Sequence, residues 1–251
     1  MNEQNPKVKS LYKAMKLIDC FNLHNPEYGI GELAELTGLP RSSVHNIMST
    51  FALLGYIAQN EKNSRYRLGY KFLERGYTTR KTNFFYDKLH PFMEEAACLT
   101  GESITYAILD GIESIYIDTA YPPLTASVRL NIGARYPLYS TAGGKSILAF
   151  SPERVFNQVC ENEMIALTDT TITSVSELEE EIKNIRHRGY AIDNMENEYG
   201  VRGLAIPLWN NNGEFMGALS LSGPAHRITD ELISGLVNIL LEVQRKIKAL
   251  Q

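Results

Sequence analysis

The chain has 251 residues, which suits one large domain or two, and a formal net charge of −4. Its three cysteines, Cys20, Cys98 and Cys160, lie far apart, which excludes a disulfide framework and favours reduced core thiols. No apolar run is long enough to span a membrane and no signal peptide is present, so we expect a cytoplasmic protein without membrane contact.

The charge is unevenly distributed along the chain. Residues 1–90 hold 13 Lys+Arg and 8 Asp+Glu, whereas the remainder holds 12 and 21. This asymmetry favours a cationic DNA-binding module joined to an acidic body that repels phosphate.

Apolar spacing predicts a first amphipathic helix that buries Leu11, Met15, Ile18 and Phe21, followed by turn residues at 25–29. A second helix over about 31–37 has Leu33 and Leu36 on its apolar side. Gly38 ends this helix.

Pro40 stands where another helix can begin, because its missing N–H is not needed there. This third helix carries an apolar stripe, which comprises Val44, Ile47, Met48, Phe51 and Leu54. Two helices joined by a tight turn favour a helix-turn-helix, whose second helix enters the DNA major groove.

The other face of the third helix is polar, as a groove-reading helix requires. We expect it to contact DNA through Arg41, Ser42, Ser43, His45, Asn46 and Ser49. The alternative is an ordinary helical pair with a solvated polar face.

Residues 56–59 and 65–68 predict two strands joined by a polar turn. Such a hairpin favours the wing of a winged helix, with Lys62, Arg65 and Arg67 as further DNA-binding candidates. The alternative is a charged hairpin edge that prevents aggregation.

A basic helix from residue 70 to about 80 predicts a linker, and a second helix follows over about 84–100. We therefore expect a DNA-binding domain at 1–69, a linker helix at 70–82 and a second domain at 83–251.

The second domain alternates strands and helices. Two predicted hairpins cover residues 105–118 and 204–221, and a helix between them has a predicted capping box at Ser176 and Glu179. The last helix, from Thr229, is expected to bury Leu232, Leu236, Leu240, Val243 and Ile247. This arrangement predicts an α+β domain.

Several chemistries are excluded. Residues 141–146 end like a phosphate-binding loop, but Tyr139 stands where that motif requires glycine. No Gly-x-Ser-x-Gly or His-Glu-x-x-His motif is present, and the five histidines are scattered, so we expect no metal or cofactor. The two glycines of this segment have two equally favoured interpretations. They either open a helix whose first amides bind an anion, near Lys145 and Arg135, or allow an ordinary helix start to pack closely.

The chain resembles the IclR family of transcriptional regulators over nearly its whole length. The helix-turn-helix segment, residues 133–145 (GARYPLYSTAGGK) and residues 189–207 (GYAIDNME running on to GLAIP) carry the resemblance. It implies a winged helix-turn-helix domain, a linker helix and a GAF-like effector-binding domain for a small molecule, usually a carboxylate. It also implies homodimers through the DNA-binding part, homotetramers through the effector part and a palindromic operator on double-stranded DNA.

The resemblance also implies an effector pocket formed by Val128, Ala142, Gly143, Asp193, Val201, Gly203, Ser220 and Ser222. Gly203 departs from the family, which commonly has Cys, Ser or Ala there, so the effector is expected to be larger or differently held. Residues 137–142 and 171–174 resemble members that sense pectin-derived sugar acids. The residues themselves favour a hydroxy acid, since Asp193 accepts from hydroxyls while serines and helix amides hold a carboxylate. Alternatively, Asp193 is a surface carboxylate and the serines belong to a solvated strand face.

We therefore expect a DNA-binding regulator controlled by a hydroxy, keto or sugar acid. The effector is expected to close loops around the pocket, shift the linker helices and change the spacing of paired recognition helices. Repression is our working assumption, although the sequence does not distinguish it from activation. The alternative is an enzyme that acts on a small acid through Asp193 and Lys145.

Overall fold

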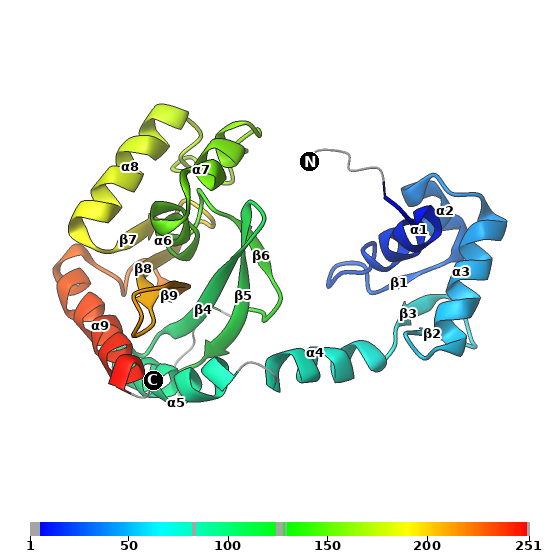
Figure 1. Cartoon of the computed structure of the whole chain (residues 1–251), viewed down its shortest axis with the longest axis horizontal. Coiled ribbons are helices and arrows are strands. Elements are labelled where there is room, and N and C mark those ends of the chain that lie inside the picture. The colour runs from blue at the N-terminus through cyan, green and yellow to red at the C-terminus, as the bar shows by residue number, and fades with distance from the viewer. Residues whose placement is uncertain (1–5, 82–83, 124–127, 129, 250–251) are drawn as a thin grey trace. The chain divides into compact units, whose positions relative to one another are not determined.

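The computed structural model describes residues 6–81, 84–123, 128 and 130–249. The chain divides into two compact units, residues 1–83 and 84–251, which are drawn in Figure 1. Within the described ranges, no helix combines the length and apolarity that crossing a membrane requires. Residue 82, the end of the expected linker helix, lies outside the described residues.

The first unit is a helix-turn-helix followed by a hairpin. Its elements are α1 (Lys9–Ile18), β1 (Glu27–Tyr28), α2 (Ile30–Thr37), α3 (Arg41–Leu53), β2 (Ile57–Gln59), β3 (Tyr66–Leu68) and α4 (Lys71–Lys81). Gly38 ends α2 with φ of +69°, in the left-handed region that glycine tolerates, and Pro40 precedes α3 as expected. The core joins the helices to the sheet through Leu17, Leu33, Val44, Met48 and Tyr66.

The strand β1 was not predicted, because residues 25–29 were interpreted as a turn. It forms because Glu27 and Tyr28 pair with Arg67 and Tyr66 of β3, so the sheet has the order β1-β3-β2. Its partner lies almost 40 residues away, which local patterns do not reveal.

Four apolar side chains that were expected to be buried are exposed: Leu11, Met15, Leu36 and Leu54. The core covers α1 near its C-terminal end, where Leu17 and Ile18 are buried. Helical spacing identified an apolar stripe on each helix, but the neighbouring elements cover only part of it.

The second unit contains α5 (Phe84–Thr100), β4 (Ser103–Asp110), β5 (Glu113–Ala120), β6 (Arg135–Pro137), α6 (Ala142–Phe150), α7 (Glu153–Cys160), α8 (Val175–Arg188), β7 (Ala191–Asn194), β8 (Val201–Trp209), β9 (Phe215–Pro224), a 3₁₀ turn η1 (Asp230–Leu232) and α9 (Ile233–Ala249). The six strands form one antiparallel sheet of order β6-β5-β4-β9-β8-β7. Both expected hairpins are present within it.

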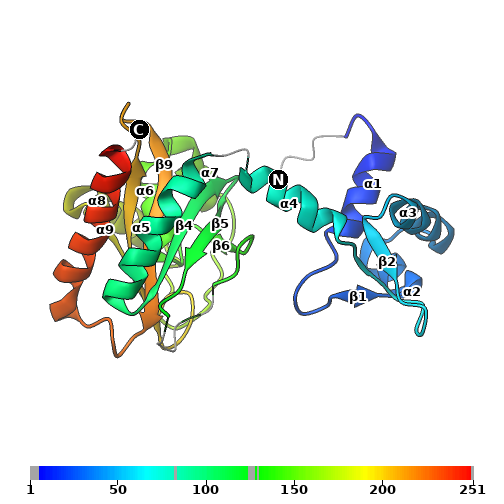
Figure 2. The same ribbon diagram turned by 90° about the horizontal axis from the view of Figure 1, so that it is seen from below.

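Helices cover both faces of this sheet (Figures 1 and 2). Leu204, Leu219 and Leu221 pack with α5 and α9 on one face. Ala205 and Ala218 pack with α6, α7 and α8 on the other. Strand alternation therefore places Gly203, Ser220 and Ser222 on the α6 face.

Three local predictions for this unit were wrong. The cap of α8 is Ser174, whose hydroxyl accepts from the Glu177 amide, so the predicted capping box was displaced by two residues. Leu232 is exposed in η1, while Ile233 and Val237 are buried. The thiol of Cys98 is exposed and is not a core group.

Candidate functional site

The outer face of α3 is polar and accessible. Val44 and Met48 are fully buried on its inner face, which orients the helix. Four polar residues recur at helical spacing on the outer face: Ser42, His45, Asn46 and Ser49. Arg41, the first residue of the helix, is exposed, and Ser43 is half-buried. This face can present donors and acceptors to base edges.

The three basic residues of the hairpin differ in their surroundings. Lys62 in the turn and Arg67 on β3 are exposed. Arg65 instead forms an ion pair with Glu32 of α2 at 2.8 Å and donates to the Glu27 carbonyl at 2.9 Å. Arg65 therefore holds the hairpin against the helix-turn-helix.

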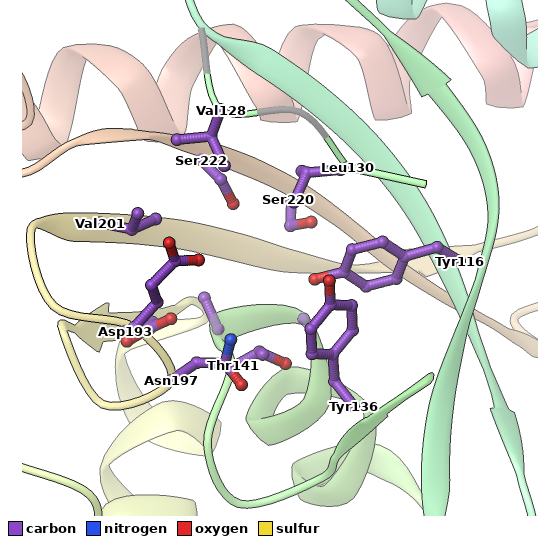
Figure 3. A pocket seen from close by; sticks show the side chains of 13 residues that line it. Tyr116, Val128, Leu130, Tyr136, Thr141, Asp193, Asn197, Val201, Ser220 and Ser222 are labelled. Carbon is purple, nitrogen blue, oxygen red and sulfur yellow. The ribbon is translucent and has the colours of Figure 1, made fainter. Parts of the chain in front are cut away.

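A small cavity lies between the second sheet and the N-terminal end of α6 (Figure 3). Its volume is about 50 Å³. Its wall combines aromatic, hydroxyl, amide and acidic side chains with two backbone positions of α6, as follows: Tyr116, Val128, Leu130, Tyr136, Thr141, Ala142, Gly143, Asp193, Asn197, Glu198, Val201, Ser220 and Ser222.

Asp193 is a buried carboxyl group in the wall of this cavity. It lies on β7, pairs with Gly203 of β8 and is 6% exposed. The pKa of Asp193 is raised to about 7, mainly by burial and also by the nearby Glu196 carboxylate, against the lowering effect of backbone hydrogen bonds and Lys145. The Glu196 amide donates to Asp193 Oδ1 at 2.7 Å.

Lys145 does not line the cavity. Its ammonium group is fully buried and donates to both Glu196 carboxylate oxygens, at 2.6 and 2.7 Å. Glu181 of α8 lies 3.7 Å from the same nitrogen. This ion pair joins α6 to the turn after β7, so Lys145 stabilises the turn that positions Asp193.

The start of α6 is partly capped. The Thr141 hydroxyl accepts from the Gly144 amide at 2.9 Å. A Cβ on Gly144 would lie 2.9 Å from the backbone of Pro137 and Leu138, so this glycine serves close packing. Arg135 pairs with Asp110 and Glu113 and does not line the cavity. Of the described residues 141–145, Thr141, Ala142 and Gly143 line the cavity, whereas Gly144 and Lys145 do not.

Seven of the eight expected pocket residues line the cavity, and Gly203 does not. A Cβ on Gly203 would lie 3.3 Å from the Leu221 carbonyl oxygen, 3.4 Å from Ser222 Oγ and 3.5 Å from the Ala142 side chain, so a glycine at this position lets β8 pack closely against its neighbours. Sequence reasoning missed six lining residues: Tyr116, Leu130, Tyr136, Thr141, Asn197 and Glu198. Their position within or beside the two motifs was a usable signal for Tyr136, Thr141, Asn197 and Glu198.

Within the described ranges, no group of three or more His, Cys, Asp or Glu side chains could hold a metal ion. The buried acids are engaged in ion pairs or in the cavity wall. Binding at this site would depend on hydrogen bonds and shape.

Comparison with known proteins identifies the same family in both units of the chain. Residues 10–61 match the IclR helix-turn-helix domain, and residues 81–249 match the bacterial transcriptional regulator IclR C-terminal family. The chain is 35% identical to the HTH-type transcriptional regulator XynR of Escherichia coli, over 90% of each chain. It is 31% identical to the regulator KdgR of the same organism, over 99% of this chain and 95% of KdgR.

Solved structures agree with the fold. The Thermotoga maritima IclR structure is 31% identical, with a TM-score of 0.74, over 96% of this chain and 98% of that one. An IclR homolog from Microbacterium hydrocarbonoxydans, complexed with 4-hydroxybenzoate, is 18% identical with a TM-score of 0.81, over 96% and 99%, which supports the fold alone.

Proposed function

This chain belongs to the IclR family of DNA-binding transcriptional regulators, and from this premise we propose that it binds a DNA operator through α3 and the hairpin and responds to a small organic acid. The matching families and relatives are transcriptional regulators with a C-terminal effector-binding domain, not enzymes. Lys145, which the enzyme alternative required, is held by Glu196 in a buried ion pair. We also infer that the protein acts in the cytoplasm, beside its DNA, and that repression is its mode.

The observation that carries the DNA-binding proposal is the exposed polar face of α3. Burial of Val44 and Met48 leaves Ser42, His45 and Asn46 outward, with Arg41 beside them. We assign contacts with the DNA bases to Ser42, His45, Asn46 and Ser49. We assign contacts with the DNA phosphate backbone to Arg41, Ser43, Lys62 and Arg67. Arg65 has a supporting role within the protein.

An Arg41→Ala variant tests this assignment. Operator DNA is first selected in vitro from random duplexes with the wild-type protein. Binding of the variant to selected and random duplexes is then measured by fluorescence anisotropy at several salt concentrations. Affinity should fall on both duplexes and the salt slope should become shallower by about one, because one phosphate contact is lost.

Arg154→Ala removes an exposed arginine on α7 and is the matched control. Unchanged duplex binding by Arg41→Ala would contradict the proposed docking face. Equal losses in both variants would instead indicate a nonspecific charge effect.

We propose a hydroxy, keto or sugar acid as the effector. The amides of Ala142 and Gly143 with the hydroxyls of Ser220 and Ser222 supply donors for a carboxylate, and helix N-termini favour anions. Asp193 supplies an acceptor for a hydroxyl. Val128 and Val201 form an apolar part of the wall.

We further propose that the protein is a dimer through its first unit. The helix α4 buries none of its residues, and Leu73 and Tyr77, four residues apart, are exposed on it. Val8, which precedes α1, and three residues of that helix are also exposed: Leu11, Tyr12 and Met15. A helix without a buried face is marginal in water, so these surfaces favour a second copy as partner.

A further inference from the structure

The cavity beside α6 is acidic. Asp193 and Glu198 line it, and its lining residues in the described part of the chain include no Lys, Arg or His. The nearby cation, Lys145, is already bound by Glu196 and is not part of the wall. An anionic effector therefore meets hydrogen-bond donors there, but no opposite charge.

A carboxylate that enters this cavity lies beside the buried Asp193 carboxyl. Asp193 lines the same small cavity as Ala142 and Gly143 of α6 and Ser220 and Ser222 of β9, so a carboxylate bound by these donors lies in a site that Asp193 shares. Two carboxyl groups that share a buried site are not both ionised, because their negative charges repel each other. The pair therefore keeps one proton.

Resting on the proposed function above, we propose that an acid effector binds this pocket together with one proton, held between Asp193 and the effector carboxylate. The proton comes from solvent and forms an O–H bond with an Asp193 carboxyl oxygen, which then donates to the anionic effector. The Glu196 amide donates to Asp193 Oδ1, and the Asn197 amide also donates to this carboxyl, so we place the proton on Oδ2. Asp193 thus becomes a donor for the effector.

The groups around Asp193 are compatible with this proton uptake. Tyr116 of β5 faces it and has a pKa raised mainly by burial, so it stays neutral. Glu196 and Glu198 follow β7, Tyr136 of β6 lines the same cavity, and Lys145 of α6 offsets part of the acidic charge. The pKa of Asp193 is raised to about 7, mainly by burial, so this carboxyl is partly ionised at neutral pH when no effector is bound. Binding of the effector then completes the protonation of Asp193.

Isothermal titration calorimetry tests the proposal on the full chain. The probes are lactate, pyruvate and glucuronate, with lactamide as a neutral counterpart of lactate. Each is titrated at pH 6 and pH 8.5 in two buffers of different ionisation enthalpy, which yields the number of protons taken up. We expect nearly one proton at pH 8.5, a small fraction at pH 6, and an affinity that falls about tenfold per pH unit above 7.

Two variants assign the proton. Asp193→Asn should bind the acid with no proton uptake and with equal affinity at both pH values, and circular dichroism checks its fold. Glu161→Gln removes an exposed acid at the end of α7 and should retain the wild-type linkage.

The outcomes separate two failures. Binding of an acid by the wild-type protein without proton uptake at pH 8.5 would overturn the proton linkage and leave the proposed function intact. Binding of lactamide as tightly as lactate would also overturn it, since the carboxylate would not be recognised. If none of the three acids binds at either pH, the acid effector and the linkage both fail.

Discussion

The residues around Asp193 form a small network of buried charges. Lys145 and Glu196 form a buried ion pair, and the Glu196 amide donates a hydrogen bond to Asp193. Glu196 also has a pKa raised by burial, which the Lys145 ammonium opposes. Lys145 lies near Asp193 and lowers its pKa, but burial outweighs this effect, so the pKa of Asp193 is raised to about 7.

This burial predicts a pH-dependent stability. A folded-state pKa raised from 3.8 to about 7 means that the folded state binds the proton more tightly, so stability is lost as pH rises from about 4 to 7. The loss amounts to about 4 kcal/mol at most. Asp193→Asn should therefore be more stable than wild type at pH 8, with a much smaller difference at pH 4.5, as measured by urea unfolding. A constant difference across this range would contradict the assignment.

Two adjacent glycines are expected to respond differently to alanine. Gly144→Ala places a Cβ 2.9 Å from the Pro137 and Leu138 backbone and should destabilise the protein by about 1–3 kcal/mol. Gly143→Ala meets Ser220 Oγ at an ordinary 3.6 Å and should keep the fold while weakening effector binding, because it narrows the cavity. Thermal unfolding and calorimetry separate these effects. Equal stability of the two variants would contradict the close packing of Gly144.

Two arginines of the hairpin also form a matched pair. Arg65→Ala breaks a partly exposed ion pair with Glu32 and should cost up to about 1 kcal/mol of stability. Arg67→Ala alters an exposed side chain and should weaken DNA binding without changing stability. Chemical unfolding and DNA anisotropy of both variants provide the measurement, and a reversed pattern would exchange their assigned roles.

At the scale of elements, α4 carries two large apolar side chains that are exposed, Leu73 and Tyr77. Its residues are half-buried at best, although Leu73 and Tyr77 are large and apolar. Helices of this kind are stabilised by packing against another chain more than by their own propensity.

Leu73→Glu should therefore weaken self-association. We expect sedimentation equilibrium to give a dimer dissociation constant at least about tenfold larger, which corresponds to about 1.4 kcal/mol. The control is Leu23→Glu, which alters another exposed leucine of the same unit, 79% exposed. Equal association of both variants and wild type would place the contact elsewhere.

At the scale of the whole molecule, regulation requires the effector site and the DNA site to be coupled. Any factor by which the effector changes DNA affinity must equal the factor by which DNA changes effector affinity. Titrations of effector in the absence and presence of the selected operator should give this same factor, expected between about 5 and 150. A factor of one in both directions would show that the pocket does not control DNA binding.

Much of the architecture was predictable from the sequence, because it depends on local patterns. Helical spacing identified α3 with Val44 and Met48 on its inner face, and Gly38 and Pro40 marked the turn before it. Strand alternation placed Ser220 and Ser222 on one face. The family motifs placed Ala142, Gly143 and Asp193 together, and the structure brings these residues to one cavity.

Tertiary structure alone decided which surfaces are covered and which charges meet. Nothing local showed that Glu27 and Tyr28 pair with β3, or that Leu11 and Leu36 stay exposed. The sequence by itself determined the order of the elements and their inner faces, because side-chain spacing and turn residues act within a few positions. The ion pair of Lys145 with Glu196 joins residues 51 positions apart, whose proximity only the folded sheet establishes.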